Sequence, residues 1–506
     1  MSKMHCADLG NGYYQNPVIF GGHGDSTILK DGDDYWMTFG IETEGTERSA
    51  LMYHSKDLVN WETAYYMFKN LDMIMWAPEL VKVGDTYYYY NFSPATDPHW
   101  NYGSVYVSWT KDIKKGDWTE PRLIRANIPS IDPGHVIGED GKRYLFMSQN
   151  AMFPLTDDGL KSAGDYKLVY PTWPIPDEFD VEGTCTESPK LLRHDGWLYL
   201  TTAQGGTMGP STSHMIISLR SKSVFGPWEL SPYNPVKHTY SADETWARKG
   251  HGTLVEGPDG KSWYIVYGGF LKGHRGTTGK ATLLEPIEWT EDGWWKIKEG
   301  CKDDEPIPMP VGGENVNNLE DLDLDFTNGE FPLLWNPSER FASERFDWNE
   351  RGLTLSGKGS DLVESSPIFQ KREHLNYEVI CELTAEWHAC AGICIGGAHG
   401  ASGIALEQDR IKIVNPAARW MNVREHEIVN EHSSWEGNHI WFKLVCVDDI
   451  VKPWYSYDGD NWKKLNFCTD LSTSSIGGFH TAFYPGIFCY GSGQATFRSW
   501  KLNALD

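Results

Sequence analysis

The sequence predicts an all-β chain in which a five-bladed β-propeller is followed by a β-sandwich. One short phrase, a Gly/Asp turn followed by an aromatic strand, recurs five times in the first 300 residues. The chain is also rich in strand-forming and turn-forming residues, with 13% aromatic residues, 51 Gly and 27 Pro. At 506 residues it is too long for one ordinary core, so we expect at least two domains.

The five copies of the phrase are each expected to be a hairpin. They read DGDDYWM from Asp31, VGDTYYYY from Val83, EDGKRYLFM from Glu139, HDGWLYL from His194 and PDGKSWYIV from Pro258. The turns lie about 50 to 65 residues apart, which is enough for one four-stranded antiparallel sheet each. Five such sheets close radially into a propeller and leave few free edges. A large sandwich with coincidental turns is the alternative.

The domain boundaries follow from a change in composition. An acidic, Pro-rich stretch follows Cys301 and indicates a linker. Beyond it, strand patterns such as YEVICELTAEW and IWFKLVCV continue without a convincing helical period, as expected for a sandwich. We therefore expect the propeller at 1–303, the linker at 304–321 and the sandwich at 322–506.

Charge and cysteine content narrow the possible partners and the compartment. The net charge of −25 repels phosphate backbones and anionic membranes, so we expect neither nucleic acid nor membrane as a partner. The nine Cys contain no C-x-x-C pair, which favours reduced thiols. The first residues lack an apolar signal-peptide core, so we expect a cytoplasmic protein unless a leader was removed. The oligomeric state stays open.

A polar residue precedes each of the five turns at an odd spacing from the turn glycine. These residues are Asp25, Glu79, Asp132, Glu187 and His251. Odd spacing puts them on equivalent faces of extended strands, and the innermost strand of each blade lines the centre of a propeller. Each alone could be a turn residue, a strand-end charge or a structural histidine. Their shared register predicts a site in which carboxylates and one histidine converge.

Converging carboxylates near Trp side chains are suited to glycoside hydrolysis. One carboxylic acid protonates the leaving oxygen while a second carboxylate activates water. A third carboxylate beside the acid raises its pKa by like-charge repulsion. No H-E-x-x-H, G-x-S-x-G or G-x-x-x-x-G-K-[ST] motif appears, so metal hydrolysis, serine hydrolysis and nucleotide binding are disfavoured.

The first 300 residues resemble glycoside hydrolase family 43, the inverting β-xylosidases and α-L-arabinofuranosidases of five-bladed propeller fold. The matching stretches include NPVIFGGHGDSTILKDGDDYWM, MWAPELVKVGDTYYYY, SIDPGHVIGEDGKRYLF, ESPKLLRHDGWLYLTTAQGGT and GHGTLVEGPDGKSWYIVYGG. By position, Asp25 resembles the general base, Glu187 the general acid and Asp132 the residue that modulates the pKa of the acid. The second domain resembles the concanavalin-like sandwich of related β-xylosidases, from which a loop can close one side of the active site.

The resemblance also implies substrate-binding residues and a metal. The substrate-binding candidates are Trp76, Glu79, Gln204, His251, Arg275 and Lys280. His251 falls where many members hold a central Ca²⁺, often through water, so the resemblance implies a structural Ca²⁺ there and no cofactor for the chemistry. The segment around Lys280 stands where xylosidases commonly place an Arg that contacts the sugar, and Arg275 is a nearby substitute.

We therefore expect an inverting exo-glycosidase that releases a terminal pentose, β-1,4-linked xylose first, from hemicellulose oligosaccharides. An α-L-arabinofuranosidase or a galactan-active member of the family is the near alternative, since the residues around Asp25 and Glu187 depart from the common pattern. Retaining fructan-processing enzymes are disfavoured, because their nucleophile motif and Arg-Asp-Pro are missing. A non-catalytic carbohydrate-binding propeller is the alternative from a different class.

Overall fold

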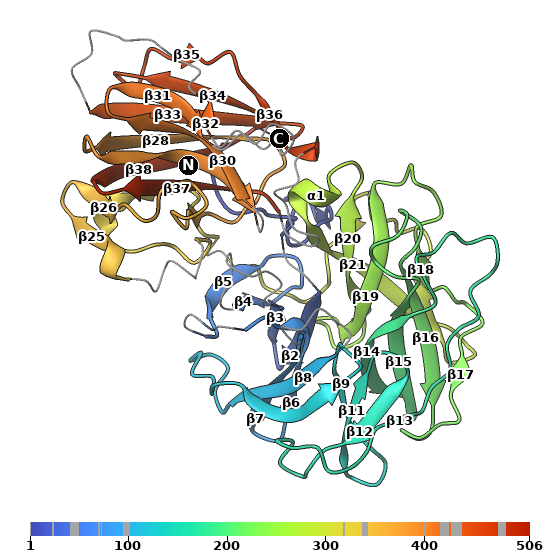
Figure 1. Ribbon diagram of the computed structural model, residues 1–506. Helices are drawn as coiled ribbons and strands as arrows, with labels where there is room; N and C mark the ends of the chain where they lie inside the picture. Colours follow the sequence, from blue (N-terminus) through green and yellow to red (C-terminus); the bar gives the residue numbers. More distant parts are fainter. Residues whose placement is uncertain are drawn as a thin grey trace.

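The computed structural model consists of two β domains that lie side by side (Figure 1). It describes residues 2–22, 25–40, 50–68, 71, 73–94, 102–316, 319–335, 343–397, 400–414, 425–426, 438–473 and 482–505. The first domain arranges five antiparallel sheets around a common centre, and the second stacks two sheets. The expected all-β propeller and sandwich are thereby confirmed. No described helix is long and apolar enough to cross a membrane.

The five sheets of the propeller follow one another along the chain. Blade 1 contains β2 (Ser26–Asp31), β3 (Asp34–Phe39), β4 (Leu51–Ser55) and β5 (Glu62–Tyr66). Blade 2 contains β6 (Trp76–Val83), β7 (Thr86–Pro94), β8 (Gly103–Thr110) and β9 (Arg122–Ile128). Blade 3 contains β10 (Gly134–Ile137), β11 (Arg143–Met147), β12 (Ala151–Pro154) and β13 (Lys167–Leu168).

Blades 4 and 5 complete the ring. Blade 4 contains β14 (Thr186–His194), β15 (Trp197–Gln204), β16 (Met215–Ser221) and β17 (Glu229–Leu230), with β18 (Lys237–His238) also paired to β16. Blade 5 contains β19 (Trp246–Glu256), β20 (Trp263–Leu271), β21 (Lys280–Trp289) and β22 (Trp295–Ile297). A short helix, α1 (Arg275–Thr278), lies between β20 and β21.

Each recurring turn joins the first and second strands of a blade, as predicted. The turn glycines all have positive φ, between 62° and 76°, at Gly32, Gly84, Gly141, Gly196 and Gly260. Residues with a Cβ rarely adopt this conformation, which explains why glycine recurs there. The first strand of each blade therefore runs toward its turn, and its starting end lies at the opposite face of the ring.

The ends of the propeller chain are fastened to each other. β1 (Tyr13–Tyr14) pairs with β23 (Ile307–Pro308), which follows the last blade. Ile19 forms an antiparallel bridge with Thr282 of β21, which links the segment before blade 1 to blade 5. These pairings hold the ring closed between its first and last blades.

The sandwich has a larger and a smaller antiparallel sheet. The larger contains β24 (Leu324–Asp325), β25 (Phe346–Asn349), β26 (Gly352–Ser356), β28 (Tyr377–Ala385), β33 (His439–Val447), β34 (Ile450–Ser456), β35 (Lys463–Lys464), β36 (Thr469–Asp470) and β38 (Gln494–Ala504). The smaller contains β27 (Ile368–Phe369), β29 (Ala389–Gly397), β30 (Gly400–Glu407), β31 (Arg410–Val414), β32 (Glu425–His426) and β37 (Tyr484–Gly491). The 3₁₀ turns are η1 (Phe326–Asn328), η2 (Ser343–Arg345) and η4 (Leu471–Thr473).

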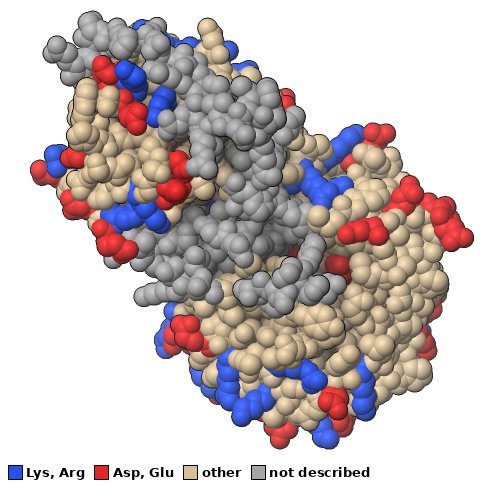
Figure 2. All heavy atoms as spheres, viewed as in Figure 1, with Lys and Arg blue, Asp and Glu red and all other residues tan. Residues whose placement is uncertain are grey.

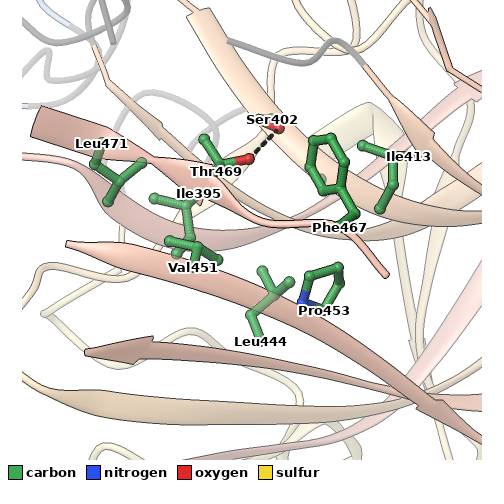
Figure 3. A pocket seen from close by; sticks show the side chains of 10 residues that line it. Ile395, Ser402, Ile413, Leu444, Val451, Pro453, Phe467, Thr469 and Leu471 are labelled. Carbon is green, nitrogen blue, oxygen red and sulfur yellow. Dashed lines mark hydrogen bonds between the residues drawn. The ribbon is translucent and has the colours of Figure 1, made fainter. Parts of the chain in front are cut away.

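The space between the two sheets of the sandwich is tightly packed. Buried and partly exposed residues alternate along β28, as expected for a strand with one face in the core. The cavity between the sheets, lined by Ile395, Leu444 and Phe467 among others, holds about 10 Å³ (Figure 3). That volume is no more than one water molecule needs, so this interior has no room for a ligand.

The two domains contact each other through buried polar groups, and we call this contact the seam. Asp449 accepts hydrogen bonds from Thr277 of α1 (2.7 Å) and from Arg372 (3.3 Å), and it pairs with His274 (2.6 Å). The hydroxyl of Tyr484 donates to the carbonyl of Gly22 at 2.9 Å. The sandwich therefore reaches both α1 and the segment that precedes blade 1.

Candidate active site

The candidate catalytic residues lie where the first strands of the blades begin. Asp25 directly precedes β2, Asp132 precedes β10, and Glu187 and His251 lie within β14 and β19. The backbone departs from regular strand geometry here, with positive φ at Ala77, Asp132, Ser188 and His251. Strand registers shift after Trp76, after Glu187 and on both sides of Gly250. Bulges of this kind turn side chains away from the sheet.

His251 is the residue around which the three carboxylates gather. Its Nδ1 lies 3.2 Å from Oδ2 of Asp25, and its Nε2 lies 3.3 Å from Oε2 of Glu187. Oδ2 of Asp132 is 3.9 Å from the same Nε2. Asp25 and Glu187 therefore lie at opposite nitrogens of one imidazole ring, on residues that are distant in the sequence.

Lys280 is the cation that accompanies Asp25. Its ammonium donates to Oδ1 of Asp25, and its side chain is fully buried at 0% exposure. β21 begins at Lys280, two residues after the end of α1, so the start of this strand carries the positive charge to the centre of the ring. A buried ammonium group that donates to a carboxyl oxygen favours the ionised form of that carboxyl group.

Asp132 is the most deeply buried of the three carboxylates. It accepts a hydrogen bond from the backbone N–H of Ser188 at 3.0 Å, which ties blade 3 to the residue after Glu187. Burial raises the pKa of Asp132 to about 7, and the charges of Glu187 and Asp25 add to the rise while His251 opposes it. This carboxyl group therefore keeps its proton up to near-neutral pH.

Glu187 is less enclosed, with 18% of its side chain exposed. Burial acts to raise its pKa, but the hydrogen bond with His251 and the charges of His214 and His251 outweigh it and lower the pKa. The pKa of His214 is itself lowered to about 3 by burial and by the charge of Lys280, so His214 is neutral near pH 7. The hydrogen bond with His251 is the largest of the effects that lower the pKa of Glu187.

His214 is a further residue beside Glu187 that no motif in the sequence marks. It is fully buried, and its Nε2 lies 3.8 Å from Oε2 of Glu187. It directly precedes β16, the third strand of blade 4, whereas the recurring phrase marks only the first two strands of each blade. No spacing rule in the sequence connects it to Glu187.

Glu79 lies apart from the group around His251, in an ion pair of its own. Its Oε2 is 2.6 Å from Nζ of Lys190, and both residues are buried. Lys190 also donates to the carbonyl of Pro78 at 2.7 Å. Burial raises the pKa of Glu79, although Lys190 opposes the rise. The pair joins the first strands of blades 2 and 4 across the ring.

The other substrate-binding candidates have varied surroundings. Trp76 opens β6, is partly exposed, and has its ring 5.9 Å from that of Phe92. The buried amide of Gln204 is engaged by the backbone of Trp173, at 3.0 Å and 3.2 Å. Arg275 lies at the start of α1 and donates to the carbonyl of Met208 at 3.3 Å.

The group around His251 offers donors of mixed type to a metal. Glu187, His214 and His251 place one ligand atom each within 4.8 Å of one another. Two imidazole nitrogens and one carboxylate suit a transition metal, whereas Ca²⁺ prefers six to eight oxygen ligands. Because both nitrogens of His251 face carboxylates, direct Ca²⁺ binding by His251 does not fit this arrangement.

Comparison with known proteins identifies the family of both domains. The family model of glycosyl hydrolases family 43 matches residues 14–295, and that of the β-xylosidase C-terminal concanavalin A-like domain matches 323–501. A putative β-xylosidase of Escherichia coli is 25% identical over 541 residues, covering 94% of this chain and 96% of its own. A xylosidase/arabinosidase 43B of Humicola insolens is 27% identical over 393 residues, covering 72% of this chain and 70% of its own.

The solved structures agree with this assignment. The GH43 protein BlXynB of Bacillus licheniformis superposes with a TM-score of 0.82 at 26% identity, covering 97% of this chain and 100% of its own. The fold is also that of a xylan β-1,4-xylosidase of Bacillus halodurans, with a TM-score of 0.81 at 22% identity, covering 97% and 99% of the two chains. This chain therefore belongs to glycosyl hydrolases family 43 and is a glycoside hydrolase, an enzyme class that acts on oligosaccharides.

Proposed function

We propose that this glycoside hydrolase is an inverting, exo-acting enzyme that releases a terminal pentose, β-1,4-linked xylose first, from hemicellulose oligosaccharides. Asp25 is the general base, Glu187 the general acid and Asp132 the residue that modulates the pKa of the acid. The observation that carries the proposal is the position of Asp25 and Glu187 at opposite nitrogens of His251. Inverting enzymes hold their two carboxyl groups about 6.5–9.5 Å apart to leave room for a water molecule.

The surroundings of Asp25 support its role as the base. A general base must be ionised to accept a proton from water. Lys280 donates to one oxygen of Asp25, and the other oxygen faces His251. The lysine therefore favours the reactive, ionised form of this carboxylate.

The proton on the acid depends on its neighbours. Glu187 must be protonated to donate to the leaving oxygen, and the positive charge of His251 opposes this. Burial and the negative charge of Asp25 act in the opposite direction, and both favour protonated Glu187. The charge of Glu187 also raises the pKa of Asp132, so the protonation states of these two carboxyl groups depend on each other.

The names of similar proteins support pentose as the sugar. They include β-xylosidases and xylosidase/arabinosidases, and a non-reducing end α-L-arabinofuranosidase of Bacteroides ovatus is 27% identical over 383 residues. Arabinofuranoside cleavage is therefore the second candidate activity.

The test measures hydrolysis of xylobiose and of the 4-nitrophenyl glycosides of β-D-xylopyranose and α-L-arabinofuranose. In the Glu187→Gln variant, the rate on xylobiose should fall by about 10² to 10⁴, because its leaving group needs the proton. The rate on the nitrophenyl substrate should fall less. Glu291→Gln, which changes an exposed glutamate, is the matched control.

The stereochemistry is read by NMR of the first product. Inversion of a β-xyloside gives α-xylose before mutarotation, and first-formed β-xylose would contradict the mechanism. An equal loss on both leaving groups would contradict the role of Glu187. Activity on the arabinofuranoside alone would replace xylose by arabinose as the sugar.

A further inference from the structure

A second cavity lies where blade 5 meets the sandwich. It has a volume of about 330 Å³ and lies between β19, α1 and η4. Three cationic side chains line it, those of Arg248, Lys272 and Arg275. Figure 2 shows Lys and Arg atoms gathered over the region of α1, next to the contact between the domains. In a chain of net charge −25, a cavity with three cations is a local exception.

The backbone directs Arg248 toward this cavity. Arg248 has a φ of 51°, and the register of β19 shifts between Ala247 and Gly250. Its backbone N–H donates to the carbonyl of Ser211 at 2.9 Å, and its Nε donates to that of Gly209 at 2.8 Å. The next residue, Lys249, is buried and pairs with Asp303 and Glu244 instead. A non-glycine residue held at positive φ costs energy and is often found at functional sites.

Arg248 and Lys272 differ in how the protein compensates their charges. Within the part of the chain that the structure describes, Arg248 forms no ion pair with a carboxylate. Burial and the charge of Arg275 lower the pKa of Arg248 to about 10, while the charge of Glu182 opposes this. Lys272 pairs at 2.9 Å with Asp243, whose side chain is largely exposed. An anion in the cavity would lower the cost of holding Arg248 near Arg275.

The cavity opens at the end of the propeller that carries the candidate catalytic residues. Arg248 precedes His251 by three residues in β19, which limits the distance between their Cα atoms to about 10 Å. Nδ1 of His214 lies 3.4 Å from the carbonyl of Arg248, while its Nε2 faces Glu187. A substrate bound to Asp25 and Glu187 could therefore place a neighbouring substituent in this cavity.

The rest of the lining fits a sugar ring better than a bare anion. Ala247 and Leu271 give it an apolar wall. Gly273 and Gly276 add no side chain, and the remaining lining residues are Ser211, Thr277 and Ser472. Its volume lies at the lower end of the range of small-molecule sites, about 300–1,000 Å³. Guanidinium groups bind carboxylates with two parallel hydrogen bonds.

We propose that this cavity is a subsite for a carboxylate-bearing sugar, in which Arg248 and Arg275 bind the carboxylate of a hexuronic acid substituent of the substrate. The proposal depends on the proposed function in one respect only: the identity of the sugar chain to which this substituent is attached. An enzyme with this subsite accepts a substrate that has an acidic substituent beside the cleaved bond, and it uses this substituent to position the substrate.

The first test measures the binding of two monosaccharides and one inorganic anion to the protein, which needs no hydrolysis. Sodium D-glucuronate, D-xylose and sodium sulfate are titrated and followed by calorimetry. Glucuronate should bind, and Arg248→Met should weaken this binding at least about 10-fold. Arg248→Lys, which keeps the charge, should weaken it less, and Lys261→Met, which changes an exposed lysine in a distant turn, should not. Unchanged glucuronate binding in Arg248→Met would overturn the subsite, and equally tight sulfate binding would overturn its assignment to a sugar.

The second test compares a glucuronic-acid-substituted xylo-oligosaccharide with its unsubstituted counterpart. The ratio of their kcat/KM values should fall at least about 10-fold in Arg248→Met. A ratio equal to that of the wild type would overturn the link between the cavity and catalysis. If neither oligosaccharide is cleaved, the proposed pentosidase function fails, and the glucuronate titration still decides whether the cavity is an acidic-sugar site.

Discussion

The propeller and the sandwich differ in where they bury charged side chains. At the centre of the propeller, Asp25, Asp132, His251 and Lys280 meet within one cluster, and Glu79 and Lys190 form a second pair. In the sandwich, Arg372, Glu373 and Asp449 are buried at the side that faces the propeller, while apolar side chains fill the space between its sheets.

This difference follows from the two architectures. Radial sheets bring strands from distant parts of the chain to one centre, where side chains of opposite charge can compensate each other's burial. Stacked sheets bring two flat faces together, and only apolar side chains fill that space without partners. The catalytic residues are therefore expected at the centre of the propeller, and the sandwich acts on that domain through the seam.

The largest effect on stability is expected from the Glu79–Lys190 pair. Lys190→Met leaves a buried carboxylate without its cation and should reduce the free energy of unfolding by about 3–5 kcal/mol. The double variant Glu79→Met/Lys190→Met removes both charges and should recover most of this loss. Calorimetric unfolding of the three proteins measures both changes. If the double variant is as unstable as Lys190→Met, the two charges stabilise the fold by more than offsetting the cost of burying each other.

The sequence predicts this architecture well because its signals are local. The glycine of each recurring turn indicates a positive φ, and the polar residue before it indicates where the innermost strand of that blade begins. Asp25, Asp132, Glu187 and His251 were therefore found from spacing, and the structure brings them together.

Contacts between distant strands leave no such signal. The bulges after Trp76 and Glu187 change the phase of their strands, so an odd spacing alone does not bring Glu79 to the group around His251. Glu79 is five residues from its turn glycine, whereas Glu187 is nine from its own, and this places Glu79 further along the strand, against Lys190. The pairing of His214 with Glu187 likewise depends on how the first and third strands of blade 4 lie relative to each other.

A pH-dependent effect is expected from Glu373, which is buried and accepts a hydrogen bond from the backbone N–H of His5. Burial raises the pKa of this carboxyl group to about 8, against about 4.3 for an exposed glutamate. The folded state keeps the proton longer than the unfolded state, so stability falls as the pH rises from about 4.3 to about 8. Glu373→Gln removes this dependence and should stabilise the protein by on the order of 3 kcal/mol near pH 7.

Unfolding midpoints at pH 4, 7 and 8 test the role of Glu373. The advantage of Glu373→Gln should be small at pH 4 and grow with pH, while Glu350→Gln, which changes an exposed glutamate, should give no such trend. An advantage that does not change with pH would mean that Glu373 is ionised in the folded protein.

The smallest effects on stability are expected from removing single hydroxyl groups, and they allow a direct comparison of the two domains. In the sandwich, the hydroxyl of Ser402 lies 3.5 Å from that of Thr469 beside the small cavity, at the limit of a hydrogen bond (Figure 3). In the propeller, the hydroxyl of Thr27 accepts the backbone N–H of Leu80 at 2.9 Å and joins blades 1 and 2. Ser402→Ala removes a weak contact, whereas Thr27→Val leaves a buried donor without a partner.

We therefore expect Ser402→Ala to change the free energy of unfolding by less than about 1 kcal/mol, and Thr27→Val to lower it by about 1–3 kcal/mol. Denaturant unfolding of both variants measures the difference, and kcat/KM on xylobiose shows whether it reaches the active site. Thr27 lies two residues after Asp25, so its loss should also reduce activity, while Ser402→Ala should not. Equal costs for the two hydroxyls would mean that the sandwich interior depends on polar contacts as much as the propeller does, and would remove the contrast between the two domains.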